Sequence, residues 1–197
     1  WVWLIVLCLV GLVVLLQLRW QAQIAALASI VLVAAYPFMK RITWWPQAWL
    51  GMVFSWGALV GWIELRGDGL PVLAALYVGS IFWVIGYDTI YAHQDREDDA
   101  LIGLKSTALL FRERTKPMLA VFYTLAVALL ALAGWGAGAG LVFSLGLVAF
   151  AAHLSWQIGR LDIADPANCL IVFKSNRDAG LILFAALVIE AIVLRAA

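Results

Sequence analysis

The sequence predicts an all-α protein that crosses a membrane several times. Of its 197 residues, 65% are apolar and 13% are charged, whereas a soluble globular domain carries about 25% charged residues. Seven apolar segments follow one another, at residues 2–18, 24–38, 48–63, 72–92, 119–135, 141–156 and 180–194. Seven helices of about 20 residues would use about 140 residues and leave enough chain for the connections. We therefore expect one polytopic transmembrane helical bundle with seven spanning helices, and we exclude a water-soluble domain.

Each apolar segment is predicted to be helical because a backbone amide in hydrocarbon has to be bonded within its own segment. The first segment is apolar from Trp1 onward, with no Met and no basic region. It is therefore predicted to be a spanning helix and not a signal peptide, and we expect the chain to be part of a longer protein.

The connections between the segments differ in character and in charge. Residues 19–23 form a short polar link, 39–47 carry two basic residues, and 64–71 form a turn rich in Gly and Pro. Residues 93–118 are long and densely charged, 136–140 are a glycine turn, and 157–179 are long and polar. With seven crossings, the second, fourth and sixth of these connections lie on the same side of the membrane.

The basic residues predict the orientation of the bundle. Ten of the 13 Lys and Arg residues fall in those three connections, and the others are Arg19, Arg66 and Arg195. Basic connections face the cytoplasm, or the matrix in a mitochondrion, so we expect the long connections there and the protein in a bacterial or mitochondrial inner membrane. The net charge of +1 provides no field that would attract nucleic acid.

The stretch that carries most chemistry leaves the fourth apolar segment on the basic side. If the helix continues through it, Asp95 and Asp99 lie one turn apart and both carboxylates face one point. Paired carboxylates together with phosphate oxygens are ligands that Mg²⁺ prefers. Tyr87 and Tyr91 precede them at the same spacing, and Asp88 lies within the last apolar turns. An acidic carboxylate inside a membrane segment is a functional candidate, although a solvated acidic loop remains the alternative at this point.

Other polar residues have two interpretations each. Lys40, Arg41 and Lys105 either set the topology or neutralise a diphosphate. We expect His93 to be an interfacial residue. Asp162 and Asp165 precede Pro166 and are predicted to form a turn or a helix cap.

Residues 87–107 resemble the second aspartate-rich motif of the UbiA superfamily of intramembrane prenyltransferases. They are Tyr-Asp-Thr-Ile-Tyr-Ala-His-Gln-Asp-Arg-Glu-Asp-Asp-Ala-Leu-Ile-Gly-Leu-Lys-Ser-Thr. Residues 36–43, 45–47 and 176–180 are similar to further signatures of the branch that prenylates 4-hydroxybenzoate. The resemblance covers essentially the whole chain.

The resemblance implies a site and a reaction. Mg²⁺ would be held on the diphosphate by Asp95 and Asp99, with Asp98 nearby, and Lys40 would contact the diphosphate. The remaining substrate-binding candidates are Tyr36, Arg41, Tyr87, Asp88, Tyr91, Arg96 and Lys105. The implied reaction transfers a polyprenyl group from polyprenyl diphosphate to the ring of 4-hydroxybenzoate in ubiquinone biosynthesis.

One family feature is not found in these residues. The family also uses a first motif, Asn-Asp-x-x-Asp-x-x-x-Asp, near the end of its second helix. We therefore expect residues 1–197 to be a single transmembrane prenyltransferase domain that is incomplete at its N-terminus and inactive alone. The alternatives are a relative that prenylates a naphthoate, homogentisate or haem precursor, and, from another class, a cation-coupled membrane transporter.

Overall fold

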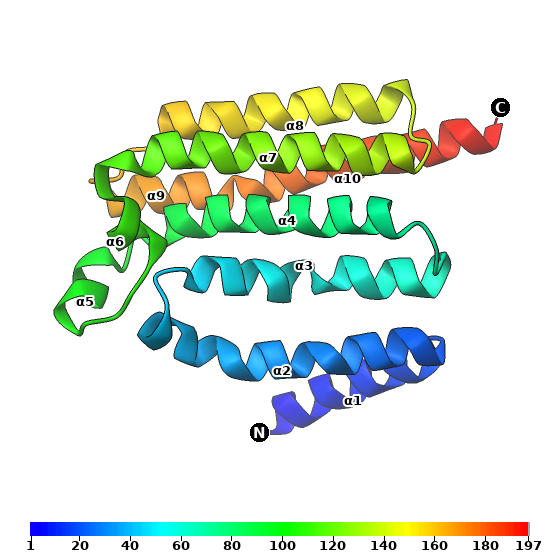
Figure 1. Ribbon diagram of the computed structural model, residues 1–197, viewed down its shortest axis with the longest axis horizontal. Helices are drawn as coiled ribbons and strands as arrows, with labels where there is room; N and C mark the ends of the chain where they lie inside the picture. The colour runs from blue at the N-terminus through cyan, green and yellow to red at the C-terminus, as the bar shows by residue number, and fades with distance from the viewer. Residues whose placement is uncertain (197) are drawn as a thin grey trace.

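The computed structural model describes residues 1–196, and every regular element in this part of the chain is a helix. The described residues form seven long helices, which run roughly along one direction (Figure 1). They are α1 (Val2–Gln17), α2 (Trp20–Ile42), α3 (Pro46–Leu65), α4 (Leu70–Tyr91), α7 (Thr115–Gly136), α8 (Leu141–Arg160) and α10 (Asn176–Ala196). The short helices α5 (Arg96–Leu101), α6 (Thr107–Phe111) and α9 (Pro166–Lys174), with the 3₁₀ turn η1 (Arg112–Arg114), gather at one end.

The seven predicted apolar segments coincide with the seven long helices within a few residues. Five helical stretches among the described residues are long and apolar enough to cross a membrane: α2, α3, α4, α8 and the run Thr107–Gly136 that contains α7. The all-helical membrane bundle is therefore confirmed. Seven crossings stay a prediction for α1, which has only 16 residues, and for α10.

Helix α4 lies at the centre of the bundle. It packs against α3 on one side and α7 on the other and also contacts α9, while α8 packs against α7 and α10. The approach of α4 to α7 depends on Gly86, because a Cβ atom at this position would overlap the ring of Tyr123. Tyr123 is 3% exposed, so the ring has no room to move aside.

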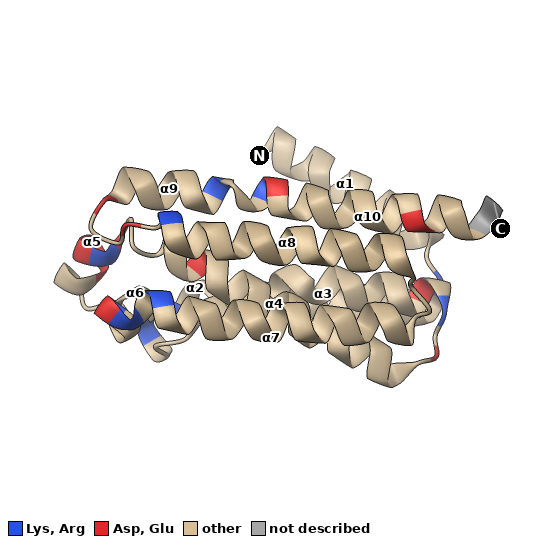
Figure 2. Ribbon diagram, turned by 90° about the horizontal axis from the view of Figure 1, so that it is seen from above, with Lys and Arg blue, Asp and Glu red and all other residues tan. Residues whose placement is uncertain are grey.

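The charged residues are concentrated at the end of the bundle that carries α5 and α6. Figure 2 shows most of the Lys, Arg, Asp and Glu residues there, with a few at the opposite end. The predicted segregation of the basic connections to one side is thus confirmed for the described residues. Asp165 caps α9 by accepting a hydrogen bond from the Ala167 N–H at 2.9 Å, which confirms the predicted helix cap.

A buried carboxylate at the opposite end was not singled out from the sequence. Glu190 on α10 is 5% exposed and accepts hydrogen bonds from the backbone N–H groups of Gly140 and Phe143, both at 2.8 Å. These N–H groups lie at the start of α8, where they lack partners within the helix and carry the positive end of its dipole. Glu190 therefore caps α8 from a neighbouring helix and joins α10 to the α7–α8 turn.

We predict that Glu190→Leu lowers the free energy of unfolding by about 3 kcal/mol, because two N–H groups would be left without an acceptor in an apolar environment. Glu190→Gln, which keeps one acceptor oxygen, should lose about half as much. Thermal and denaturant unfolding in detergent micelles, followed by circular dichroism, measures both. The control is Ile189→Leu on the exposed face of the same helix, which should match the unmodified protein. A Glu190→Leu variant as stable as this control would contradict the capping role.

Candidate functional site

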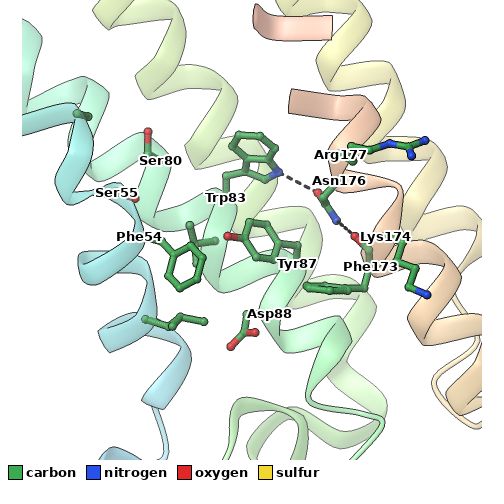
Figure 3. A pocket seen from close by; sticks show the side chains of 13 residues that line it. Phe54, Ser55, Ser80, Trp83, Tyr87, Asp88, Phe173, Lys174, Asn176 and Arg177 are labelled. Atoms are coloured by element: carbon green, nitrogen blue, oxygen red, sulfur yellow. Dashed lines mark hydrogen bonds between the residues drawn. The ribbon is translucent and has the colours of Figure 1, made fainter. Parts of the chain in front are cut away.

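A cavity of about 590 Å³ lies between α3, α4 and the α9–α10 junction. Its walls are mainly aromatic and aliphatic, with Phe54 from α3, Trp83 and Tyr87 from α4, and Phe173 from α9. Asp88 lines the same cavity. Figure 3 shows Phe54 and Tyr87 turned toward the space between α3 and α4, whereas the side chain of Arg177 points away from it. The cavity thus combines a long apolar wall with one carboxyl group.

The aromatic wall is built by residues spaced four apart on α4. The rings of Tyr87 and Tyr91 both pack on Phe173, with centroid distances of 5.8 and 4.6 Å. Trp83 packs edge-on against Tyr87 and donates a hydrogen bond from Nε1 to Asn176 Oδ1 at 3.0 Å. The prediction that Tyr87 and Tyr91 share a helix face is confirmed by their common contact with Phe173.

Residues of α2 reach the Asp88 end of this cavity. The Lys40 ammonium group interacts through space with the Asp88 carboxyl group. The Tyr36 phenol, one turn earlier on α2, interacts through space with Asp88 and Tyr91. The charged and phenolic groups of α2 and α4 are therefore near enough to influence one another at this end of the cavity.

The fourth helix does not continue through the acidic stretch, so the condition on which the predicted Asp95–Asp99 pairing rests is not met. Helix α4 ends at Tyr91, a turn follows, and α5 begins at Arg96 with Asp95 as its N-cap residue. Glu97, Asp98 and Asp99 then occupy the first turn of α5. Carboxylates are stabilised at the positive N-terminal end of a helix dipole and destabilised at the negative C-terminal end, so the acidic run favours a new helix start.

Asp95 and Asp99 nevertheless remain one helical turn apart. The Asp99 N–H donates to the Asp95 carbonyl oxygen at 2.8 Å, across the first turn of α5. Their environments differ, because Asp95 is exposed whereas Asp99 is 4% exposed. The two carboxylates therefore do not form the symmetric pair that a continuous helix predicts.

Asp99 is paired with Lys40 across the end of the bundle. Lys40 Nζ donates to both carboxylate oxygens, at 3.1 Å to Oδ1 and 2.9 Å to Oδ2. The side chain of Lys40 is 32% exposed, against 5% for Asp99. This ion pair joins the last turn of α2 to α5 and directly links two of the three predicted catalytic residues.

Lys105 fastens the connection after α5 to the same end of α2. Its backbone N–H donates to the Lys40 carbonyl oxygen at 2.8 Å, and its Nζ donates to the Ile42 carbonyl oxygen at 3.2 Å. The last carbonyl groups of a helix have no partner within it, so Lys105 satisfies groups that would otherwise need water. Its predicted role in substrate binding stays a prediction.

The donor atoms of α5 fit a magnesium ion in type but do not complete a site. Asp95 and Asp98 are exposed carboxylates on the same short segment as Asp99, and carboxylate oxygens suit Mg²⁺. Among the described residues, however, no group of three or more His, Cys, Asp or Glu side chains is arranged to hold a metal ion. The chain thus provides part of a coordination sphere, with Asp99 held by Lys40.

Two further predicted residues lie outside the cavity. Arg41 is exposed at the end of α2. Arg96 lines a separate recess of about 210 Å³ together with His93 and Asp98. Neither arginine lines the cavity, and their predicted substrate contacts stay predictions.

Sequence reasoning missed several residues that shape the cavity. Phe173 and Ser55 are the main ones. Ser55 is 5% exposed, and its Oγ has no hydrogen-bond partner within the described part of the chain. No local pattern marks either residue, because both reach the cavity through packing between distant segments. Asn176 had a weak signal as part of the stretch 176–180 noted above.

His93 is buried and not interfacial as predicted. It is 3% exposed and its Nε2 lies 3.0 Å from Thr115 Oγ1. Thr115 donates its single hydroxyl proton to the Arg112 carbonyl oxygen at 2.7 Å, so His93 Nε2 has to donate to Thr115. The Nδ1 lone pair then remains without a partner among the described residues. Burial, reinforced by the Arg96 charge, lowers the pKa of His93 from 6.5 to about 4.

Comparison with known proteins identifies related sequences. The UbiA prenyltransferase family matches residues 1–188. Mitochondrial 4-hydroxybenzoate polyprenyltransferase from Bos taurus is 50% identical over 177 residues, which cover 89% of this chain and 48% of that protein. The protein of the same description from Arabidopsis thaliana is 44% identical over 182 residues, which cover 92% of this chain and 45% of that protein. The chain thus spans about half the length of these curated relatives.

Solved structures share the fold. A UbiA homologue from Aeropyrum pernix K1 superposes with a TM-score of 0.73 at 20% identity, covering 90% of this chain and 66% of that one. A structure of digeranylgeranylglyceryl phosphate synthase in membranes superposes with a TM-score of 0.67 at 19% identity, covering 95% and 67%. At these identities the likeness establishes the fold alone.

The lowered pKa of His93 predicts a specific loss of stability in acid. Between pH 6.5 and about 4 the unfolded chain binds a proton at His93 that the folded chain does not bind, so stability falls as pH falls through this window. From pH 7 to pH 5 this amounts to about 2 kcal/mol. The difference in unfolding free energy between these pH values, measured with a chelator present, should shrink by this amount in His93→Gln. An unchanged difference would show that His93 is not the group responsible.

Proposed function

Because this chain belongs to the UbiA prenyltransferase family, we propose that the protein transfers a polyprenyl group from polyprenyl diphosphate to the ring of 4-hydroxybenzoate in ubiquinone biosynthesis. The mitochondrial relatives described above carry the name of that activity. The acceptor is inferred from those names, and naphthoate or homogentisate would be the rival acceptors within the family.

The observation that carries the proposal is that an apolar cavity lies next to the charged end of the helical bundle. Phe54, Trp83 and Phe173 provide a wall that suits isoprene units, and apolar burial supplies the binding free energy for such a chain. Lys40 lies where this wall meets α5. An amphiphile with a long apolar tail and a compact anionic head would be bound at both ends by this arrangement.

At the charged end, the residues would hold the diphosphate as its bond to the allylic carbon breaks. Lys40 donates to a phosphate oxygen and offsets the charge that develops on the leaving group. Asp95, Asp98 and Asp99 are the carboxylates on and next to α5 that would contribute oxygen ligands to Mg²⁺. When bound, the ion supplies further neutralisation of that charge. The first aspartate-rich motif of the family would complete this coordination.

The aromatic wall would protect the reacting carbon. The faces of Tyr87, Tyr91 and Trp83 are electron-rich and stabilise positive charge on the allylic carbon. Their packing excludes water, which would otherwise capture that carbon. The new bond forms between it and the ring carbon ortho to the acceptor hydroxyl group. The ring carbon then loses its proton. Asp88, the carboxyl group that lines the cavity, is the group that would accept it.

The orientation follows from the basic end of the bundle. We infer that this end faces the cytoplasm or the mitochondrial matrix, in an inner membrane, because basic connections remain on that side. Polyprenyl diphosphate would then place its head at this surface and its tail among the helices, in contact with the bilayer. The 4-hydroxybenzoate would arrive from the aqueous side.

We predict that Asp95→Asn and Asp99→Asn each reduce kcat/KM for prenyl transfer by about a hundredfold or more, because leaving-group charge is no longer offset. The assay uses membranes that contain the full-length protein, because residues 1–197 are expected to be inactive alone, with labelled polyprenyl diphosphate and 4-hydroxybenzoate as substrates. Asp68→Asn makes the same chemical change at the opposite end of the bundle and should leave the rate unchanged. Retention of most transfer by Asp95→Asn would refute the metal role, and faster transfer to a naphthoate would reassign the acceptor.

Filling the cavity should weaken the binding of long donors. Ala58 lines the cavity on α3, and Ala58→Phe would place a ring where isoprene units are proposed to lie. We expect KM for a long polyprenyl diphosphate to rise about tenfold, with a smaller change for a short donor such as geranyl diphosphate. Leu145→Phe on the exposed face of α8 is the control for added bulk. Equal KM values in both variants would contradict the proposal that the isoprenoid tail lies in this cavity.

A further inference from the structure

We propose that Lys40 is an exchangeable counter-ion that makes the binding of diphosphate and of the divalent cation cooperative. Without ligands, Lys40 neutralises Asp99, and each of these two side chains is released only when a ligand replaces its partner. A diphosphate takes over the Lys40 ammonium group, and a cation takes over the Asp99 carboxylate. This inference rests on the proposed function and adds an order of events to it.

Lys40 and Asp99 form a close ion pair in which both carboxylate oxygens take part. Both oxygens of Asp99 accept from Lys40 Nζ, at 3.1 and 2.9 Å. The carboxylate is nearly inaccessible, at 5% exposure, and Lys40 is the cation that compensates its charge among the described residues. Removal of one partner from such a pair leaves the other uncompensated, which opposes the binding of either ligand alone.

The contacts of Lys105 with the backbone of α2 keep Lys40 positioned next to Asp99. Lys105 N–H and Nζ hold the carbonyl groups of Lys40 and Ile42, which fixes the end of α2 against the connection that follows α5. The main chain therefore stays in place while the Lys40 side chain exchanges partners. Because Lys40 is 32% exposed, an anion can approach its ammonium group from the aqueous end. Lys105 is in this respect a positioning residue for Lys40.

Reciprocity follows from the shared pair. If diphosphate withdraws Lys40 from Asp99, it raises the affinity of Asp99 for a cation, and the cation raises the affinity for diphosphate by the same factor. Each ligand alone has to break the ion pair and is therefore bound more weakly. Inorganic pyrophosphate and Mn²⁺ are suitable probes because their binding can be measured without turnover.

The first test uses pyrophosphate in the presence of a chelator, so that no metal takes part. Asp99→Asn frees Lys40, and we expect it to bind pyrophosphate at least about tenfold more tightly than the unmodified protein. Asp98→Asn removes the same charge from the neighbouring, exposed position of α5 and should change the affinity by no more than about twofold. Calorimetry on the purified protein in nanodiscs gives both values. Equal effects of the two variants would overturn the proposal.

The second test uses Mn²⁺ without any diphosphate. Lys40→Met frees Asp99, and its Mn²⁺ affinity, measured by electron paramagnetic resonance, should rise at least about tenfold. Arg41→Met removes one positive charge from the adjacent exposed residue and serves as the matched control. A rise of similar size in both variants would mean that general charge, and not the pair, opposes the cation, and would overturn the proposal.

The proposed function and the counter-ion role fail in different ways. If the unmodified protein and all four variants bind neither probe, while their circular dichroism spectra show intact helices, the diphosphate site itself is refuted and the counter-ion role with it. If the probes bind but the paired variants behave alike, only the counter-ion role is refuted. Unfolding midpoints identify any variant whose loss of binding reflects a loss of structure, and Asp99→Ala then replaces Asp99→Asn.

Discussion

Hydrocarbon offers no hydrogen-bond partner, and this constraint decides where the polar groups of the chain can lie. The long helices bond their own backbone groups, so the unpaired groups are confined to helix ends. Two helix ends show how such groups are satisfied. Glu190 compensates the start of α8 from a neighbouring helix, and Lys105 compensates the end of α2 from a connection. Most of the remaining charged residues gather at one end of the bundle, where water and phosphate groups are within reach (Figure 2).

A polar network inside the bundle holds the cavity wall in place. Tyr123 donates to Gln157 Oε1 at 2.9 Å, and Gln157 Nε2 donates to Ser175 Oγ at 2.9 Å. Ser175 lies between α9 and α10, and the adjacent Asn176 donates to the Phe173 carbonyl oxygen at 3.0 Å. The break between these helices is therefore fixed by a hydrogen bond from Gln157 of α8, whose side chain is held in turn by Tyr123 of α7. Phe173 is held against the tyrosines of α4 as a result, so distant polar contacts determine the shape of an apolar wall.

The sequence predicts the elements of this fold better than the contacts of its site. Apolar runs and basic connections are strong local signals, because the bilayer imposes a length and an orientation on each helix. The break after Tyr91 has no local sequence signal of comparable strength. Spacing alone cannot distinguish a continuing helix from a turn, and here the burial of His93 against Thr115 accompanies the turn. Phe173 and Ser55 reach the cavity through tertiary packing, which no periodicity reports.

The break between α4 and α5 also explains how opposite charges from two helices meet at one end of the bundle. A continuous helix would carry its acidic residues away from the bundle on a single axis, at a C-terminal end that disfavours them. On α5 they instead occupy a helix start, and Asp99 is turned inward to Lys40. Lys105 already satisfies the last carbonyl groups of α2, so the Lys40 ammonium group is not consumed in capping its own helix. A cation and a carboxylate thus remain available to incoming ligands, which a fully compensated pair of helix ends could not provide.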